Sequence, residues 1–253
     1  MQKQEFFMQR CLEIAQKGAG NVSPNPMVGS IIVYKDKIIG EGYHEQYGDS
    51  HAEINAINSV EKKSLLQYST LYVNLEPCAH FGKNPPCCNL IIDYKIPRVV
   101  IGCIDTFYEV SGKGMERMKN NGIDIKLGVL ESESRELNKR FFTYYEKKRP
   151  YIILKWANSK DGFIAPKEQS EHFWMTCTES KKIVHQWRAV EDAILVGRNT
   201  AEKDNPSLTV REIEGNHPIR IVIDKDLKLS NALDLFNSQA ETIIFNSIKT
   251  KEI

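Results

Sequence analysis

The chain has 253 residues, enough for two domains, and its 41% hydrophobic and 26% charged content is that of an ordinary globular protein. Lysine and arginine number 34 and aspartate and glutamate 33, so the net charge of +1 predicts neither a nucleic-acid nor a membrane partner. No apolar run approaches the ~18 residues of a membrane span and the N-terminus lacks a signal-peptide core, so we expect a cytoplasmic protein. Such a compartment disfavours a disulfide framework, and we expect Cys11, Cys103 and Cys177 to be core residues.

The first half of the chain predicts alternating helices and strands. An amphipathic helix is expected over 4–17, and a hairpin of strands 30–34 and 38–42 follows. Between them Asn25 stands between two prolines, where it fits a turn as well as a binding site. Further strands are expected at 70–75, 98–103 and 123–127. Helices are expected at 51–63, at 87–94, from the loop that ends at Gly114 to about residue 121, and over 131–149. The pattern indicates an α/β protein with a mixed sheet.

The candidate catalytic groups lie in the middle of this half. We expect Ser50 to cap a helix that carries His51 and Glu53 in its first turn. Cys78 follows the strand at 70–75, and Cys87 begins the next helix, where a thiol has a lowered pKa and ligates readily. A strand end and two helix starts would therefore converge on one ion.

One imidazole and two thiolates suit zinc and leave its fourth tetrahedral position for water. Because two thiolates cancel the zinc charge, a nearby base is needed, and Glu53 is placed to serve. One alternative is a surface histidine beside reduced core cysteines. Another is a structural zinc module, which requires a fourth ligand such as Cys88 or His80.

Two further positions stand out along the chain. Asp105 comes just past the end of a strand, where α/β folds place ligand contacts, although a turn aspartate fits equally. Lys155 interrupts the apolar run 151–156, which reads as a strand, so it projects into a polar cleft or lies at an edge. We place a domain boundary near 147. Beyond it, strands are expected at 193–196, 219–223 and 242–245, with a helix at 180–188.

The motifs resemble known enzymes. His51-Ala52-Glu53 with Glu76-Pro77-Cys78 resembles the cytidine/deoxycytidylate deaminase superfamily, whose two cysteines are usually separated by two residues; here eight intervene. That longer loop, with Pro24-Asn25-Pro26 and Gly42-Tyr43-His44, resembles the bifunctional riboflavin-biosynthesis deaminase/reductase family. The similarity continues through Asp161-Gly162, Leu195-Val196-Gly197 and the run from Asp204 to Arg211, and so covers essentially the whole chain.

The resemblance implies a cytidine-deaminase-like, three-layer domain over 1–147. It implies zinc ligation by His51, Cys78 and Cys87, with Glu53 as proton shuttle, and its spacing favours Cys87 over Cys88. The substrate implied is a diaminopyrimidinone that carries a ribose 5-phosphate, deaminated at its 2-amino carbon. The implied substrate contacts are Asn25, His44, His80, Lys83 and Asp105.

For residues 148–253 the resemblance implies a dihydrofolate-reductase-like domain that uses NADPH to open the ribosyl ring. The implied cofactor contacts are Lys155, Asn158, Trp174, Thr200 and Asp204, and the implied substrate contacts are His172, Arg188, Ser207, Leu208 and Arg211. Trp174 also fits a core aromatic and Arg188 a helix-surface residue. Arginine forks suit a phosphate.

The chain departs from the family pattern at several points. Thr106-Phe107-Tyr108 stands where the family often has Pro-Asn-Pro, and His172 where a serine is usual. The chain also ends about a hundred residues before the family's reductase domain does, so we expect an incomplete domain with weak or no reductase activity. The alternatives are a deaminase-only fragment and a nucleoside or tRNA adenosine deaminase. A homo-oligomer is compatible with the sequence.

Overall fold

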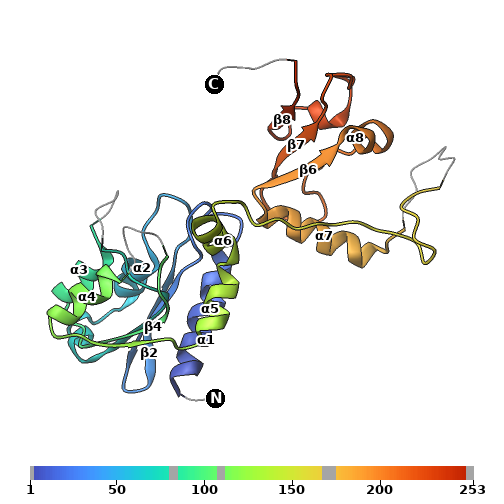
Figure 1. Ribbon diagram of the computed structural model, residues 1–253. Helices are drawn as coiled ribbons and strands as arrows, with labels where there is room; N and C mark the ends of the chain where they lie inside the picture. Colours follow the sequence, from blue (N-terminus) through green and yellow to red (C-terminus); the bar gives the residue numbers. More distant parts are fainter. Residues whose placement is uncertain (1–2, 80–84, 107–111, 167–174, 249–253) are drawn as a thin grey trace. The chain divides into compact units, whose positions relative to one another are not determined.

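The computed structural model describes residues 3–79, 85–106, 112–166 and 175–248 (Figure 1). The chain's own contacts divide it into two compact units, Met1–Ile152 and Ile153–Ile253. The assignment of domains to 1–147 and 148–253 stays a prediction. No helix of the described residues is long and apolar enough to cross a bilayer.

A mixed sheet forms the centre of the first unit, in the order β2-β1-β3-β4-β5. Strand β1 pairs antiparallel with both β2 and β3, while β3, β4 and β5 run parallel. The strands are β1 Gly29–Tyr34, β2 Lys37–Tyr43, β3 Thr70–Leu75, β4 Arg98–Cys103 and β5 Asp124–Leu127. The predicted hairpin and mixed sheet are therefore confirmed.

Helices cover both faces of this sheet, because buried apolar side chains alternate along its strands. Ile32, on one face, belongs to the core cluster that includes α2 Ala52–Ser59, α3 Cys87–Asp93 and α4 Lys113–Asn120. Ile31, on the other face, packs with α1 Lys3–Ala15. The first unit therefore has three layers (Figure 1). The residues just past β3 lie beside the starts of α2, α3 and α4.

Two predicted helices have different boundaries in the structure. The helix expected over 51–63 ends at Ser59, whose Oγ donates to the Ala56 carbonyl and accepts from Glu41 N, both at 2.9 Å, and so ties the helix end to β2. A short 3₁₀ helix, Lys63–Tyr68, follows. The helical stretch expected over 131–149 is two helices, α5 Glu131–Leu137 and α6 Lys139–Lys147, interrupted at Asn138.

The second unit contains a parallel sheet in the order β6-β7-β8. Its strands are β6 Ala193–Gly197, β7 Ile219–Ile223 and β8 Thr242–Phe245, as predicted, and its helices are α7 Thr178–Val190 and α8 Arg198–Asp204. Helix α8 was not predicted. The small buried core of the second unit consists of Ala201, Leu208, Val222 and Leu235.

The strand predicted over 151–156 is wrong: these residues form no strand, and Leu154 and Trp156 are 78% and 69% exposed. An apolar run becomes a strand only when neighbouring strands pair with it, and none of the described strands does. Lys155 is exposed. Cys177, expected in the core, is exposed at the start of α7, whereas Cys11 and Cys103 are buried as predicted.

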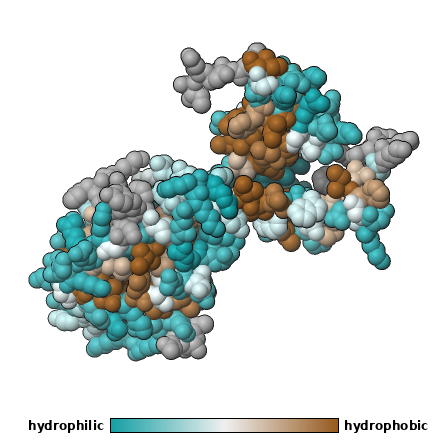
Figure 2. Space-filling view, viewed as in Figure 1, coloured by the Kyte–Doolittle hydropathy of each residue, from teal (hydrophilic) through white to brown (hydrophobic). Residues whose placement is uncertain are grey.

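Hydrophobic residues gather on part of the second unit's surface (Figure 2). Strands β6, β7 and β8 expose Leu195, Ile223, Ile243 and Phe245. This sheet is packed on one face only among the described residues, since its buried core cluster involves the alternate positions Val196, Val222 and Ile244.

Candidate metal centre

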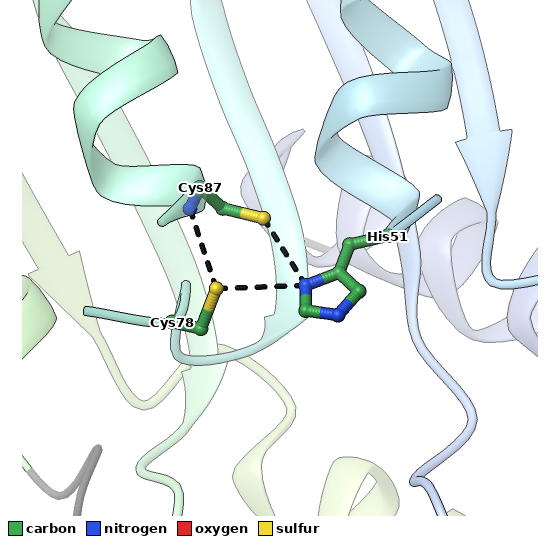
Figure 3. A group of neighbouring side chains, drawn as sticks. All are labelled: His51, Cys78 and Cys87. Atoms are coloured by element: carbon green, nitrogen blue, oxygen red, sulfur yellow. Dashed lines mark hydrogen bonds between the residues drawn. The ribbon is translucent and has the colours of Figure 1, made fainter. Parts of the chain in front are cut away.

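Three metal-donor side chains meet at one end of the first sheet (Figure 3). The Nδ1 atom of His51 is 3.3 Å from Cys87 Sγ and 3.5 Å from Cys78 Sγ. All three donor atoms lie within 4.8 Å of one another. His51 precedes α2, Cys78 follows β3, and Cys87 begins α3, so the expected convergence of two helix starts and a strand end is present.

The donor set fits a tetrahedral zinc ion. With Zn–S of about 2.3 Å and Zn–N of about 2.1 Å, neighbouring nitrogen and sulfur ligands lie about 3.6 Å apart. The distances from His51 are close to that value. No further histidine, cysteine, aspartate or glutamate joins the group within the described ranges. Three protein donors leave the fourth tetrahedral position of a zinc ion for water. This open position distinguishes a catalytic zinc site from a closed structural one.

Local backbone geometry places the two sulfurs. Pro77 follows the last β3 residues, and Pro86 occupies the position before α3. The Cys87 N–H at the start of that helix donates to Cys78 Sγ at 3.3 Å, and the Cys88 N–H donates to the Cys78 carbonyl at 3.2 Å. The first amide of the helix therefore faces the Cys78 sulfur and favours its thiolate.

The geometry separates Cys87 from its neighbour Cys88. The Cys88 thiol is buried and lies 3.6 Å from Asn89 Oδ1, outside the donor group. His80, the other candidate for a fourth ligand, lies outside the described residues.

The start of helix α2 differs from the prediction by one residue. We expected Ser50 to cap the helix, but His51 itself occupies the cap position, with extended φ/ψ of −72° and 160°, and makes no side-chain cap bond. The extended backbone leaves the imidazole free to face the two thiols. Glu53 is in the first turn, as expected.

Charge is shared within the centre. Hydrogen bonds from Cys87 and His51 hold the pKa of the Cys78 thiol far below its usual value, whereas the pKa of Cys87 lies well above it. The hydrogen bond to Cys78 raises the pKa of His51 to about 9. Thiolate and imidazolium thus stabilise each other, and a bound dication would replace the protons that they share.

Glu53 lies beside the donor group and is not a member of it. Its carboxyl group is within hydrogen-bonding reach of the Cys87 side chain and is only 3% exposed. Burial raises the pKa of Glu53 to about 7, because removal from water penalises the carboxylate. A carboxyl group held next to the ligands, without being one, is suited to proton transfer.

Two of the predicted substrate contacts lie beside the centre. The Asn25 amide is 3.1 Å from His44 Nε2, and His44 Nδ1 is 3.1 Å from the Ser50 carbonyl. Since that carbonyl can only accept, Nδ1 carries the proton and Nε2 accepts from Asn25 Nδ2. The His44 and His51 rings are 5.7 Å apart, edge to face. Burial also lowers the pKa of His44, which favours this neutral ring.

The remaining deaminase candidates are less fully placed. Asp105 is buried just past the end of β4. His80 and Lys83 lie outside the described residues.

Glu76 has a role that the sequence analysis missed. Its buried carboxylate accepts from the backbone N–H groups of Gly112, Gly114 and Met115 at 3.0, 3.1 and 3.3 Å. It therefore holds the start of α4 against the end of β3. A glutamate between a buried strand and a proline is a weak signal for such a contact, because its partners lie far along the chain.

The reductase candidates are partly gathered in the second unit. Arg188 on α7 donates to the Thr209 carbonyl at 2.6 Å, and Arg211 donates to Ser207 Oγ, so both arginines lie along the segment 207–211. Leu208 in that segment is buried with a left-handed φ of 53°. Elsewhere, Thr200 and Asp204 are on α8, Lys155 and Asn158 are exposed near the start of the unit, and His172 and Trp174 lie outside the described residues.

Family models match both units. Residues 1–103 match the cytidine and deoxycytidylate deaminase zinc-binding region, and residues 150–252 match the RibD C-terminal domain. Together, the mixed sheet and the three-donor centre define the first unit as a zinc-binding deaminase domain. The whole chain belongs to the RibD family of riboflavin biosynthesis proteins.

Individual relatives support this membership. The chain is 44% identical over 240 residues to the riboflavin biosynthesis protein RibD of Aquifex aeolicus. The matched region is 94% of this chain and 67% of that protein. It is also similar to a crystal structure of a diaminohydroxyphosphoribosylaminopyrimidine deaminase/5-amino-6-(5-phosphoribosylamino)uracil reductase from Thermotoga maritima. That match has a TM-score of 0.92 at 43% identity and covers 99% of this chain and 72% of the other.

A third relative matches about half of the chain. It is the diaminohydroxyphosphoribosylamino-pyrimidine deaminase of Buchnera aphidicola subsp. Schizaphis graminum, 46% identical over 140 residues, which are 55% of this chain and 94% of that protein.

Proposed function

We propose that this chain deaminates 2,5-diamino-6-(5-phosphoribosylamino)pyrimidin-4(3H)-one to 5-amino-6-(5-phosphoribosylamino)uracil in riboflavin biosynthesis. The observation that carries the proposal is the convergence of His51, Cys78 and Cys87 beside the buried, unligated Glu53. The name of the Buchnera relative supports the same reaction, because 140 residues of this chain match 94% of that deaminase.

The reaction exchanges an amino group for an oxygen of water. His51, Cys78 and Cys87 would hold a zinc ion, which would act as a Lewis acid and make water a stronger nucleophile near neutral pH. Glu53 accepts a proton as the water oxygen adds to the ring carbon that bears the 2-amino group. It passes that proton to the neighbouring ring nitrogen. It then takes the second water proton from the added hydroxyl group and gives it to the 2-amino group, which leaves as ammonia as the carbonyl forms. Because its carboxyl group is buried, bulk water does not compete for this role.

The substrate contacts follow from the groups around the centre. Asn25, oriented by His44, offers its amide oxygen to the pyrimidine, and Asp105 offers a buried carboxylate. We assign the phosphate to His80 and Lys83 on the basis of the resemblance and of their cationic chemistry.

For the second unit, which matches the RibD C-terminal domain, we infer a part in NADPH-dependent reduction of the ribosyl group, with weak or no activity expected of this chain by itself. Arg188, Ser207 and Arg211 are assigned to the substrate side, where two arginines suit a phosphate. Lys155, Asn158, Trp174, Thr200 and Asp204 are assigned to the cofactor. Leu208 and His172 complete the substrate side.

Two other functions receive less support. A tRNA adenosine deaminase should carry a basic surface, whereas lysine plus arginine and aspartate plus glutamate nearly balance at 34 and 33. A structural zinc module needs a fourth protein ligand, and the described residues supply only three to the group.

The proposal is tested by substitution of the proton carrier. Glu53→Gln keeps the shape of the side chain but removes its basic oxygen, so we expect full zinc content with ammonia release reduced at least about 100-fold. The matched control is Glu61→Gln, at an exposed glutamate beyond the end of α2, and it should leave the rate unchanged. Near-normal ammonia release by the Glu53 variant would contradict the assigned role.

A further inference from the structure

Two buried asparagines bind the backbone of the segment that leads into β1. The Asn138 side chain accepts from Met27 N at 2.7 Å and donates to the Met27 carbonyl at 2.9 Å. The Asn74 side chain donates to the same carbonyl at 3.0 Å and accepts from Gly29 N at 2.7 Å. These two side chains are 3% and 0% exposed. Each one therefore satisfies two backbone groups of this half-buried segment.

Asn138 comes from a distant part of the chain, at the break between α5 and α6. Its amide pairs with both polar groups of Met27, as a neighbouring β-strand would, and so fixes the peptide's rotation as well as its position. The price of this contact is the interruption of a helix, since the residue has φ/ψ of −103° and 25°.

The fixed segment supports the proposed substrate contact Asn25, which lies two residues before Met27. Pro24 and Pro26 flank Asn25 and have no N–H to anchor it from either side. The Asn25 N–H donates to the Val22 carbonyl at 2.8 Å, and its side chain contacts His44. The next contacts that hold this segment are the hydrogen bonds of Asn74 and Asn138 to the backbone at 27–29.

The same segment also holds His44, because the His44 N–H donates to the Val28 carbonyl at 2.9 Å. Asn25 and His44 are thus both attached to one short stretch of backbone. The metal donors are held mainly by other elements: Cys78 follows β3, Cys87 begins α3 and His51 precedes α2. Only His51 also borders this group, through the His44 ring and the bond from His44 to the Ser50 carbonyl.

We propose that Asn138, together with Asn74, is a positioning residue for substrate recognition, acting through the backbone at 27–29 on Asn25 and His44. This inference rests on the proposed deaminase function. It predicts that loss of the Asn138 contact weakens substrate binding while the metal centre and the proton carrier are left intact. A purely structural role would instead lower stability and activity together.

The first test is Asn138→Asp, which keeps an oxygen for Met27 N but loses the N–H that reaches the Met27 carbonyl. We expect KM for the phosphoribosylated diaminopyrimidinone to rise about tenfold, as for one lost hydrogen bond, with kcat and zinc content unchanged. The matched control is Asn121→Asp, at an exposed asparagine whose amide bonds to the Arg117 carbonyl within its own helix turn. A fall in kcat or in zinc content with unaltered KM would overturn the proposal.

A double-mutant cycle separates positioning from general destabilisation. If Asn138 acts through Asn25, then Asn138→Asp should raise KM little or not at all in a chain that already carries Asn25→Ala. Effects that multiply fully in the double variant would show that the two residues act independently, and would overturn the proposal.

Hydrogen exchange gives a readout that does not depend on turnover. In Asn138→Asp, or in Asn138→Ala if the first variant folds poorly, the peptide containing Met27 and Gly29 should exchange faster while the helix that follows His51 does not change. Unaltered exchange at 27–29 would overturn the proposal. Absence of ammonia release from the unaltered chain would instead refute the proposed function, so the two failures are distinguishable.

Discussion

Two adjacent cysteines begin helix α3, and they have different surroundings. The Cys87 sulfur is 3.3 Å from His51 Nδ1, whereas Cys88 contacts Asn89. Both are fully buried, so burial alone does not separate a ligand from a core thiol. The distinction lies in direction: successive side chains on a helix point about 100° apart, and Cys87 is the one that faces the end of β3.

Because only Cys87 faces the donor group, alanine substitutions of Cys87 and Cys88 should affect zinc binding differently. Cys87→Ala removes a donor atom and should lose zinc, with an affinity change larger than the 10–100-fold typical of residues that only support a ligand. Cys88→Ala removes a core sulfur and should retain zinc and ammonia release. Metal analysis of both purified variants checks this. Zinc loss in the Cys88 variant but not in the Cys87 variant would show that the donors are misassigned.

Residue types and their order were enough to predict a centre of one histidine and two cysteines, and the family resemblance was needed to choose Cys87 over Cys88; His51, Cys78 and Cys87 do come together. The chemistry of zinc selects these types, so a short motif carries the information. The sequence did not reveal Glu76 and Asn138, because their partners are backbone groups of distant segments. Backbone N–H and carbonyl groups look alike at every position, and only the folded chain shows which ones need a side chain.

At the scale of elements, a strand was predictable where a neighbouring strand pairs with it. The buried runs at 70–75 and 98–103 are strands, as predicted, and the structure pairs them in parallel within the sheet. The run at 151–156 is equally apolar but has no pairing strand among those described, and it is exposed. The hydrophobic pattern therefore indicates that a segment can form a buried strand. Whether it does so depends on the neighbouring strands that pair with it.

Helix α7 is joined to the segment 209–211 by a buried histidine. His185 Nδ1 accepts from the Arg211 N–H at 3.2 Å, which requires a neutral ring at that nitrogen. The groups that face it include Arg188, Arg211 and Glu212, and the pKa of His185 is lowered mainly by burial, then by the two arginines. A positive charge there would be both desolvated and repelled.

The lowered pKa predicts how the second unit responds to acid. Because the folded-state pKa of His185 lies below its unfolded value of about 6.5, the unfolded chain binds more protons between the two values, and stability falls as pH falls through that window. All three tryptophans lie in residues 153–253, so their fluorescence follows this unit. We expect the urea midpoint to be lower at pH 5.5 than at pH 7.5.

The control for this measurement is His185→Asn, whose amide oxygen replaces Nδ1 as acceptor but does not titrate. Its midpoint should change less between the two pH values. An equal change in both chains would assign the pH dependence to other groups.

At the scale of the whole molecule, the chain consists of two compact units, and the complete metal centre is in the first. The sequence correctly predicted two α/β parts, because motifs and sheet-forming runs recur on both sides of a basic, charge-rich stretch. The Buchnera relative, 94% of which is matched by 140 residues of this chain, has the length of the first unit. The deaminase chemistry should therefore need no residue after 152.

A chain of residues 1–152 is expected to release ammonia with kcat and KM within about threefold of those of the 253-residue chain, because every proposed ligand and contact of the deaminase is retained. Steady-state kinetics on both chains decide this. A folded, zinc-loaded 1–152 chain without activity would show that the second unit contributes to the site.

The most direct test of the zinc-dependent deaminase is ammonia release from the phosphoribosylated diaminopyrimidinone before and after removal of metal. We predict that a chelator abolishes ammonia release, and that one equivalent of Zn²⁺, but not of Mg²⁺, restores it, because two thiolates and an imidazole select the softer ion. Ammonia release that continued at an unchanged rate after complete zinc removal would contradict the account.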